Sequence, residues 1–411
     1  MSTVAETVTI ETLGHSGDGI AETAAGRVFV PHTLPGETVE IERDGERGRL
    51  VRVVTASADR VAPVCLNFGR CGTCALEHMA RPAYLDWKRA QVAAAFAQRG
   101  IVAEIDPAAA TLPGGRRRAI FSAIRTAKGT VLGFHARGSE EIVPVRECVV
   151  LHPGIVSKLP LLNAIANILL PRWKPARITV FLADNGLDVA VAGAGKLTQA
   201  MLERLGSFGN DPALARLTVD GVEVLRGRQP EFAAGPAMLF PVPGGFTQAA
   251  KSAEAALAEA VVAHIGDAGP VADLFAGIGT FTFRLEAKAA VTAVEGDAAL
   301  VAAIEMAARK ANHLKKVTAR RRDLFANPLS PVELDAFRAV VFDPPAAGAK
   351  AQSEMLAKSK VAKIAAVSCN PATLARDARI LIDGGYRLTR VLPVDQFLFS
   401  AEIEAVATFE R

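Results

Sequence analysis

The chain has 411 residues, half of them hydrophobic, and a formal net charge of +4 at pH 7. This length exceeds what one hydrophobic core usually holds, so two or three domains are expected. No apolar run is long enough to cross a bilayer, and the first residues lack the basic and apolar regions of a secretory signal. We therefore expect a cytoplasmic protein without a membrane partner.

The first domain is predicted at residues 1–58, where short apolar segments alternate with glycines between residues 7 and 56. Many short strands with regular turns indicate a small β-barrel of the oligonucleotide-binding kind. Such barrels often accept single-stranded RNA. A barrel that only braces a neighbouring domain would have the same pattern, so its role stays open here.

A central α+β domain is predicted at residues 59–235. A helical pattern covers about 82–99, and two pairs of alternating strands occupy 120–138 and 176–195. The segment 232–245, rich in proline and glycine, is predicted to be the boundary to a third domain.

Four of the five cysteines form a distinct pattern in this central region. Cys65, Cys71 and Cys74 lie close together, and Cys148 follows at a distance. Because disulfides are disfavoured in a cytoplasmic chain, such a group indicates a metal or metal-cluster site. Four thiolates fit either zinc or a [4Fe–4S] cluster, and the wide first gap slightly favours iron–sulfur.

The third domain is predicted at residues 236–411, where short apolar runs alternate with helical stretches. This rhythm predicts an α/β fold with a doubly wound, Rossmann-like parallel sheet. The last two strands, at 386–394 and 402–411, are expected to pair as an antiparallel edge.

A glycine-rich turn follows the strand that ends at Phe275 and contains Gly277 and Gly279. Glycines let the backbone approach a ligand closely, although such a turn alone is weak evidence. Glu295 ends the next strand, where an acidic side chain can hold two ribose hydroxyls. Thr282 replaces the third glycine of the dinucleotide-binding turn, which disfavours a nicotinamide oxidoreductase and favours a ligand without phosphates, such as S-adenosylmethionine.

Two basic clusters, at 116–118 and 320–322, could contact RNA phosphates, and two lysines at 315–316 precede the second cluster. Either cluster alone is more typical of a solvated charged edge. Asp323, beside the second cluster, either accepts a hydrogen bond from an adenine amino group or balances these arginines.

A candidate nucleophile, Cys369, lies in a Ser-Cys-Asn-Pro turn at the end of an apolar strand, and Asp343 ends the preceding strand. Ligands of open α/β sheets bind at this edge. A buried cysteine is usually a small hydrophobe, but the flanking turn residues favour a site. A thiolate that adds to carbon 6 of uracil makes carbon 5 nucleophilic, and a base must then remove the carbon 5 proton. Either Glu402 or Glu404 could be that base.

These motifs together resemble the RNA 5-methyluridine methyltransferase family, in particular its ribosomal RNA branch with an iron–sulfur cluster. Residues 7–56 are similar to a TRAM domain. The other matching motifs follow in the family's order: Phe-Thr-Gln at 246–248, DLFAGIGTFTF at 273–283, VEGD at 294–297, Asp-Pro-Pro at 343–345 and SCNPATLARD at 368–377. The last of these is the most specific.

The resemblance implies an enzyme that acts on RNA, uses S-adenosylmethionine and holds a [4Fe–4S] cluster. We expect the protein to be a monomer, and we expect the cluster to be structural because four cysteines are present to hold it. The resemblance also implies Cys369 as nucleophile and Glu404 as base, because the family's terminal His-x-Glu aligns with residues 402–404. The implied cofactor contacts are Gln248, Phe275, Thr280, Glu295, Asp323 and Asp343. The implied cluster ligands are Cys65, Cys71, Cys74 and Cys148.

Three positions depart from the family's pattern, which usually has arginine at Ala346, asparagine at Ala250 and histidine at Glu402. All three are expected near the substrate. Two alternatives therefore stay open: a transfer RNA T-loop uridine methyltransferase, and an RNA-binding assembly factor with weakened catalysis. The transfer RNA branch typically lacks both the barrel and the cluster, so their presence favours ribosomal RNA.

Overall fold

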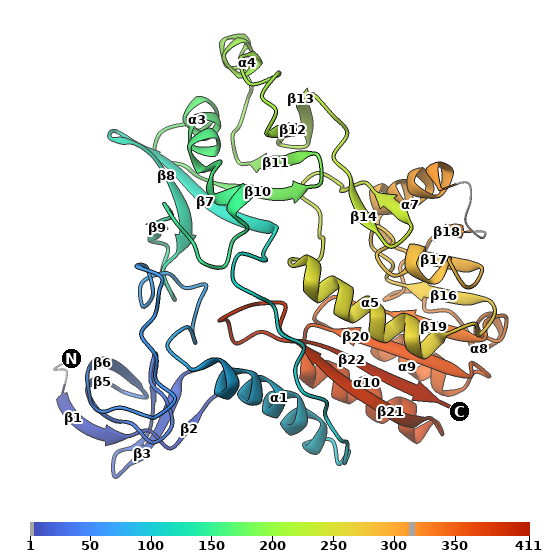
Figure 1. The fold of residues 1–411 in the computed structure, drawn as a ribbon, viewed down its shortest axis with the longest axis horizontal. Helices are drawn as coiled ribbons and strands as arrows, with labels where there is room; N and C mark the ends of the chain where they lie inside the picture. Colours follow the sequence, from blue (N-terminus) through green and yellow to red (C-terminus); the bar gives the residue numbers. More distant parts are fainter. Residues whose placement is uncertain (1–3, 312–316) are drawn as a thin grey trace.

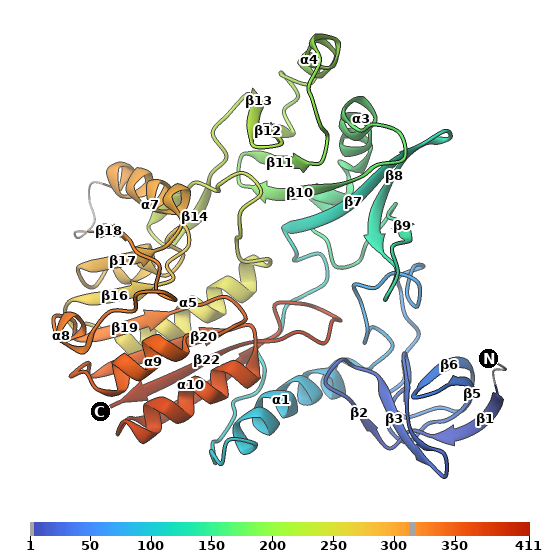
Figure 2. The ribbon, with the colours of Figure 1, turned by 180° about the vertical axis from the view of Figure 1, so that it is seen from behind.

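The computed structural model describes residues 4–311 and 317–411, and its strands form three main sheets (Figures 1 and 2). Within the described residues, no helix combines the length and the apolar character needed to span a membrane. The lysines at 315–316 fall outside the described residues.

The N-terminal sheet curls on itself, as the predicted barrel requires. Its strands follow the order β1-β5-β6-β4-β3-β2. In the short segment of chain that joins the two edge strands β1 and β2, the Ile10 amide donates to the Glu37 carbonyl and the Glu11 amide donates to the Ile20 carbonyl, each at 2.8 Å. Alternating valines and isoleucines fill the interior. The strands are β1 (Val4–Thr9), β2 (Thr12–Leu13), β3 (Gly19–Thr23), β4 (Gly26–Val30), β5 (Thr38–Asp44) and β6 (Arg47–Thr55).

The central sheet has the order β13-β12-β11-β10-β7-β8-β9, and α3 packs on it. Both predicted strand pairs are confirmed as β7 with β8 and β10 with β11. The strands are β7 (Arg118–Thr126), β8 (Gly129–His135), β9 (Ile142–Pro144), β10 (Pro175–Ala183), β11 (Gly186–Ala192), β12 (Leu214–Val219) and β13 (Val222–Arg226). The helices are α2 (Pro153–Val156), α3 (Leu159–Leu169) and α4 (Gln199–Gly206).

The predicted helix near 82–99 is confirmed as α1 (Arg81–Ala97), but it packs against α10 (Pro371–Asp383) and β21 (Arg387–Val394), in the C-terminal part of the chain. Val92 and Phe96 lie on its buried stripe and join the same core as β19 (Ala339–Phe342) and β20 (Lys363–Ser368). The segment after α1 then pairs along β21, through bridges from Ile105 to Val391 and from Ala109 to Val394. Apolar burial, not position along the chain, decides which domain this helix supports.

At the predicted boundary near residue 235, the chain forms a hairpin of β14 (Phe232–Ala234) and β15 (Ala237–Leu239). Gly235 occupies the turn with φ +62°. The hairpin packs on α7, so the division between the second and third domains stays a prediction.

The C-terminal sheet has the order β18-β17-β16-β19-β20-β22-β21. Its first five strands are parallel, and β22 and β21 add the predicted antiparallel edge. The strands are β16 (Val271–Leu274), β17 (Val291–Glu295), β18 (Val317–Arg321), β19 (Ala339–Phe342), β20 (Lys363–Ser368), β21 (Arg387–Val394) and β22 (Glu404–Glu410). The helices are α5 (Lys251–Ile265), α6 (Thr282–Leu285), α7 (Ala298–Lys310), α8 (Pro331–Leu334), α9 (Lys350–Ala357) and α10 (Pro371–Asp383).

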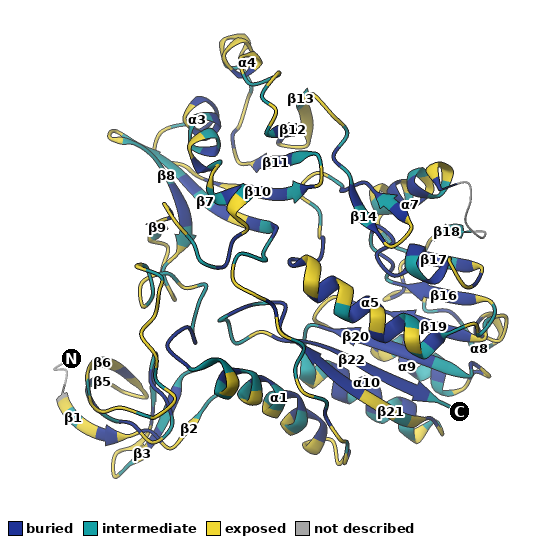
Figure 3. Ribbon diagram, viewed as in Figure 1, coloured by how far each residue is buried: buried dark blue, intermediate teal, exposed yellow. Residues whose placement is uncertain are grey.

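The central strands β16, β19 and β20 of this sheet are buried on both faces (Figure 3). Val340 and Ala366 belong to the core under α9 and α10, whereas Val341 and Val367 belong to the core under α5. This alternation is the period-2 geometry of a strand. Because β17 and β19 lie on opposite sides of β16, the strand order reverses there, and ligands of such sheets bind at that point.

Candidate active site

A cavity of about 500 Å³ opens at the carboxyl ends of β16, β17, β19 and β20. All eight residues predicted for the cofactor and for catalysis line it. They are Gln248, Phe275, Thr280, Glu295, Asp323, Asp343, Cys369 and Glu404. The topology therefore brings together side chains that are spread over more than 150 residues of sequence.

The glycine-rich turn adopts a conformation that ordinary side chains avoid. Phe275, Gly277 and Gly279 all have positive φ angles of 57°, 58° and 95°. A Cβ on Gly279 would lie 2.7 Å from the ring of Phe283, so only glycine fits. For Phe275 this backbone is strained, and such strain is typical of ligand-binding turns.

Thr282 holds this turn against the sheet. Its hydroxyl donates to Asp273 Oδ2 at 2.6 Å, and both side chains are fully buried. Burial raises the pKa of Asp273 to about 7. The sequence indicated only that residue 282 is not a glycine. The structure shows that Thr282 has a structural role, because its hydroxyl links the start of α6 to Asp273 in β16.

Glu295 ends β17, and its carboxylate accepts backbone N–H groups from the glycine turn and from the start of the next loop. Oε2 accepts from Gly277 at 2.9 Å, and Oε1 accepts from Gly296 at 2.6 Å and from Asp297 at 3.0 Å. A carboxylate has about four acceptor sites, so about one remains for a ribose hydroxyl.

Asp323 follows β18 and orders its own turn, since Oδ1 accepts from Phe325 N at 2.9 Å. The neighbouring Arg322 pairs with Glu333 at 2.6 Å, so another acid neutralises this arginine. The ring of Phe325 lies 5.2 Å from that of Phe275, and both rings line the cavity. Two aromatic faces beside an acid suit a flat heterocycle with an amino group.

Cys369 lies between β20 and α10 and is half-buried. Asn370 caps α10, since its Oδ1 accepts from Ala372 N at 3.0 Å, and this bond fixes the turn that carries the cysteine. Burial, and then the nearby carboxylates of Glu404 and Asp343, raise the pKa of the Cys369 thiol to about 11.

Two carboxyl groups lie beside this thiol, that of Asp343, which is half-buried, and that of Glu404, which is buried. Gln248 Nε2 donates to Asp343 Oδ2 at 3.2 Å, and Gln396 Nε2 donates to Glu404 Oε1 at 3.1 Å. Burial raises the pKa of Asp343 to about 7. Burial, with the charge of Asp343, raises the pKa of Glu404 well above its usual range. Two carboxyl groups in one apolar site resist simultaneous ionisation, which suits proton transfer.

A second cavity, of about 520 Å³, shares Cys369 and Ala346 with the first. Its other walls come from α1, the start of α10 and one residue of the N-terminal barrel, His15. Glu402 lines this second cavity, whereas Glu404 lines the first. Ala250 is fully buried at the start of α5 and belongs to neither set of described lining residues.

The four predicted metal ligands, Cys65, Cys71, Cys74 and Cys148, also line a single cavity, of about 20 Å³. All are half-buried free thiols. Within residues 4–311 and 317–411, no three His, Cys, Asp or Glu side chains are arranged to hold a single metal ion.

The basic cluster at 116–118 is largely internal. Arg117 is buried, forms an ion pair with Glu254, and stacks over Phe232 with 4.7 Å to the ring centroid. Arg116 lies over Phe397, which lines the first cavity. For Arg117, neither a phosphate contact nor the favoured solvated charged edge is found, because this side chain is buried and Glu254 neutralises it.

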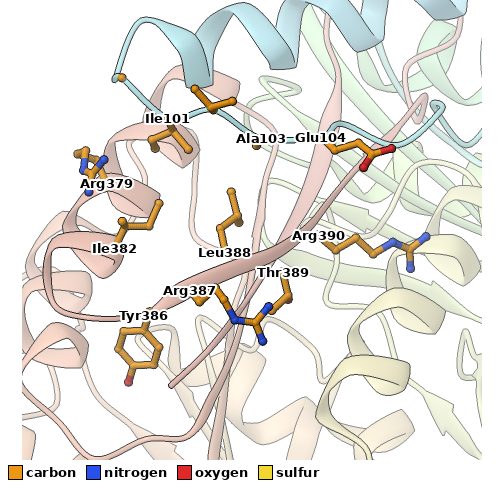
Figure 4. A pocket seen from close by; sticks show the side chains of 12 residues that line it. Ile101, Ala103, Glu104, Arg379, Ile382, Tyr386, Arg387, Leu388, Thr389 and Arg390 are labelled. Carbon is orange, nitrogen blue, oxygen red and sulfur yellow. The ribbon is translucent and has the colours of Figure 1, made fainter.

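A further cavity, of about 490 Å³, lies where the segment after α1 crosses α10 and β21 (Figure 4). Three arginines line it, but each is paired with a carboxylate. The pairs are Arg379 with Asp383 at 2.6 Å, Arg387 with Glu410 at 3.2 Å and Arg390 with Asp106 at 2.5 Å. Its charge is therefore compensated, and its described lining is separate from that of the active-site cavities.

Sequence reasoning missed Gln396, Phe397 and Phe325. Gln396 lies eight residues before Glu404 with no recognisable motif between them, so its contact with the carboxylate becomes visible only in the folded chain. An exposed phenylalanine such as Phe325 has no signal in a single sequence.

Comparison with known proteins identifies two family regions. Residues 244–411 match the tRNA (uracil-5-)-methyltransferase family, and residues 5–42 match the TRAM domain. An uncharacterized RNA methyltransferase of Mesorhizobium japonicum is 46% identical over 98% of this chain and 97% of its own length. The 23S rRNA (uracil(1939)-C(5))-methyltransferase of Chromohalobacter salexigens is 34% identical over 99% of this chain and 90% of its own length.

Among solved structures, the tRNA (uracil-54, C5)-methyltransferase of Pyrococcus abyssi, in complex with S-adenosyl-L-homocysteine, has a TM-score of 0.76 and 20% identity. The likeness covers 98% of this chain and 99% of that one. The fold, N-terminal barrel included, is thus shared with an enzyme named for transfer RNA. The expectation that the barrel distinguishes ribosomal from transfer RNA enzymes is wrong.

Proposed function

The chain belongs to the RNA (uracil-5-)-methyltransferase family, and from this premise we propose that it methylates carbon 5 of a uridine in 23S rRNA, with Cys369 as covalent nucleophile and Glu404 as general base. The methyl donor of this family is S-adenosylmethionine. The observation that supports the assignment most is that Cys369, Asp343 and Glu404 line the same cavity as the glycine turn.

We assign the cofactor contacts to Gln248, Phe275, Thr280, Glu295, Asp323 and Asp343. The chemistry of the cavity supports this set. The amide oxygen of Gln248 is buried and has no hydrogen-bond partner among the described residues, so it offers an acceptor to the amino group of the methionine part. Glu295 offers an acceptor to the ribose, and Phe275 offers a ring face to the adenine.

The first chemical step belongs to Cys369. Its thiolate adds to carbon 6 of uracil, and the resulting enolate attacks the donor's methyl group through carbon 5, which the electron-poor ring could not do unaided. The bond between the methyl group and the donor sulfur breaks, its electron pair stays on that sulfur, and S-adenosylhomocysteine leaves. The raised pKa of the thiol opposes its ionisation. A positive charge at the methyl donor favours the thiolate, so the nucleophile forms best once the cofactor is bound.

The second step belongs to Glu404. A carboxylate oxygen removes the proton on carbon 5, the electron pair of that C–H bond forms the carbon 5–carbon 6 double bond, and the sulfur of Cys369 leaves as a thiolate. Glu404 is suited to this task because it is almost completely buried beside the thiol's cavity, and a raised pKa makes it a stronger base.

The second cavity is the proposed entrance for the uridine, because a base bound there would meet Cys369 from the side opposite the cofactor. A uridine in folded RNA must leave its stack to reach this position, at a cost of about a few kcal/mol. His15 and α1 at the rim are available to the flanking nucleotides.

Ribosomal RNA is favoured over transfer RNA by likeness in sequence. The relative named for 23S rRNA is 34% identical over 99% of the chain, whereas the structure named for tRNA is 20% identical. The second candidate, a tRNA uridine methyltransferase, retains support from the shared fold and from the match of residues 244–411 to the tRNA (uracil-5-)-methyltransferase family. A catalytically weakened assembly factor is disfavoured by the complete catalytic set.

We also propose that Cys65, Cys71, Cys74 and Cys148 hold a [4Fe–4S] cluster that ties the loop near Cys65 to the segment at Cys148. The support is the gathering of four thiols around one small cavity, which is the donor set of such clusters. Protein purified without air should be brown and contain about four iron atoms per chain. A colourless, folded preparation that holds zinc would contradict this assignment.

The catalytic proposal is tested with RNA that contains 5-fluorouridine. Fluorine at carbon 5 prevents proton removal, so the protein, S-adenosylmethionine and a fluorinated 23S rRNA transcript should give an RNA–protein adduct that survives denaturation. The mechanism would be refuted if Cys369→Ala formed the adduct. It would also be refuted if the wild type formed no adduct with the fluorinated form of an RNA that it methylates. Mapping of 5-methyluridine in 23S rRNA and tRNA from a strain without the protein decides the substrate.

A further inference from the structure

The loop that joins β21 to β22, residues 395–403, reaches out from the sheet toward the start of α1 (Figures 1 and 2). It ends directly before Glu404, the first residue of β22. Contacts that fix the position of this loop therefore also affect the position of Glu404, the proposed base.

A buried ion pair from α1 clamps the loop at its beginning. Lys88 Nζ lies 2.8 Å from Asp395 Oδ1, and both side chains are fully buried. Tyr84, one turn earlier on α1, donates its hydroxyl to the same oxygen at 2.7 Å. A buried ion pair gains little stability over apolar packing, so its value here would lie in defining one geometry.

Lys88 also clamps the middle and the end of the loop. Its ammonium group donates to the carbonyl of Phe397 at 3.1 Å and to that of Glu402 at 2.5 Å. With the bond to Asp395, all three ammonium protons are engaged. Tyr84 contacts a fourth residue of the loop, because its oxygen accepts a hydrogen bond from Phe399 N at 2.9 Å. One helix thus fixes four points of this loop.

Gln396 connects the clamp to the active site. It follows Asp395 directly, is 1% exposed, and donates its Nε2 to Glu404 Oε1 at 3.1 Å. The other carboxylate oxygen, Glu404 Oε2, is buried and has no hydrogen-bond partner among the described residues. One oxygen is therefore occupied and the other is left available for a proton.

We infer that Gln396 is a positioning residue for the base Glu404, and that the Lys88–Asp395 clamp from α1 holds Gln396 in place. The inference rests on the proposed function. The amide donor fixes the rotation of the Glu404 carboxylate, so that Oε2 faces the carbon 5 proton that it removes. It also favours the ionised form of Glu404, which opposes the effect of burial on the pKa.

The two chemical steps separate this role from a merely structural one. Loss of the Gln396 amide leaves Cys369 and the cofactor residues in place, so methyl transfer and adduct formation continue. Removal of the carbon 5 proton slows, and the sulfur–carbon 6 bond persists. A methylated RNA–protein adduct should then accumulate on ordinary uridine RNA, without fluorine.

The test compares Gln396→Met, which keeps the side-chain volume but removes the donor, with Glu404→Gln and with Gln199→Met as an exposed control. Each protein receives methyl-labelled S-adenosylmethionine and a natural 23S rRNA transcript. We expect Gln396→Met to release product at least about tenfold more slowly than wild type and to trap labelled adduct, as Glu404→Gln does. Release by Gln396→Met should also require a higher pH.

Each outcome has a distinct meaning. If wild type gives no adduct even with fluorinated RNA that it binds, the proposed function fails and the inference falls with it. If Glu404→Gln traps adduct while Gln396→Met matches wild type, the positioning role alone is refuted. Equal loss of adduct formation and release in Gln396→Met would also refute it. Tyr84→Phe removes one hydrogen bond to Asp395 and should trap a smaller amount of adduct. If Tyr84→Phe released product as fast as the wild type, the role of the α1 contacts in holding Gln396 would be excluded.

Discussion

The thiol of Cys369 offers the sharpest test of the electrostatics in the cavity. Its pKa is raised to about 11 by burial and by the charges of Glu404 and Asp343. An opposite charge within a few ångströms lowers the pKa of an acid by about 1–3 units. S-adenosylmethionine carries a sulfonium charge, whereas S-adenosylhomocysteine is neutral and nearly the same in shape. We therefore expect a pKa of about 8–10 with the first ligand and near 11 with the second.

The assay follows alkylation of Cys369 by iodoacetamide across pH 7–11. Trypsin releases residues 364–376, a peptide in which Cys369 is the only cysteine, so mass spectrometry reports this thiol alone. The thiolate fraction at about pH 8 rises about tenfold for each unit of pKa lowered, but a less basic thiolate is also less nucleophilic. The net gain with S-adenosylmethionine over S-adenosylhomocysteine should be about 3- to 30-fold.

The control is Glu404→Gln with S-adenosylhomocysteine, in which loss of a like charge should also lower the pKa of Cys369. Identical pH profiles with the two ligands, both shown to be bound, would refute the idea that the cofactor's charge activates the nucleophile.

Three further predictions concern stability and metal content. The pKa of Asp273 is about 7 in the fold, above the usual value for this side chain. The free energy of unfolding of the wild type should therefore fall by up to about 4 kcal/mol as the pH rises from about 4 through 7. Chemical unfolding of Asp273→Asn should show no such fall. Arg117→Met leaves buried Glu254 with Arg284 alone and should lower the free energy of unfolding by about 3 kcal/mol; a change under about 1 kcal/mol would contradict the buried pairing. Cys148→Ser should reduce the iron content of protein purified without air, and full iron occupancy would exclude this cysteine as a ligand.

Much of the fold could be predicted because it depends on local patterns. The alternation of apolar residues in β7, β8, β10 and β11 predicts strands, and the short apolar runs of the C-terminal half predict a parallel sheet. Once that sheet is expected, Glu295, Asp343 and Cys369 must share one edge, since each follows a parallel strand. The cavity that they line was therefore predictable in its main residues.

The sequence by itself determined the chemistry available to this protein: a thiol, carboxyl groups and a glycine turn at the ends of neighbouring strands. Only the tertiary structure decided which groups meet across long stretches of chain. Lys88 contacts Asp395 across 307 residues, and no local pattern marks either as a partner. The pairing arises because α1 buries its apolar stripe on the C-terminal core, which brings its lysine to the loop before Glu404. Such contacts depend on packing among distant elements, and a single sequence contains no periodic signal for them.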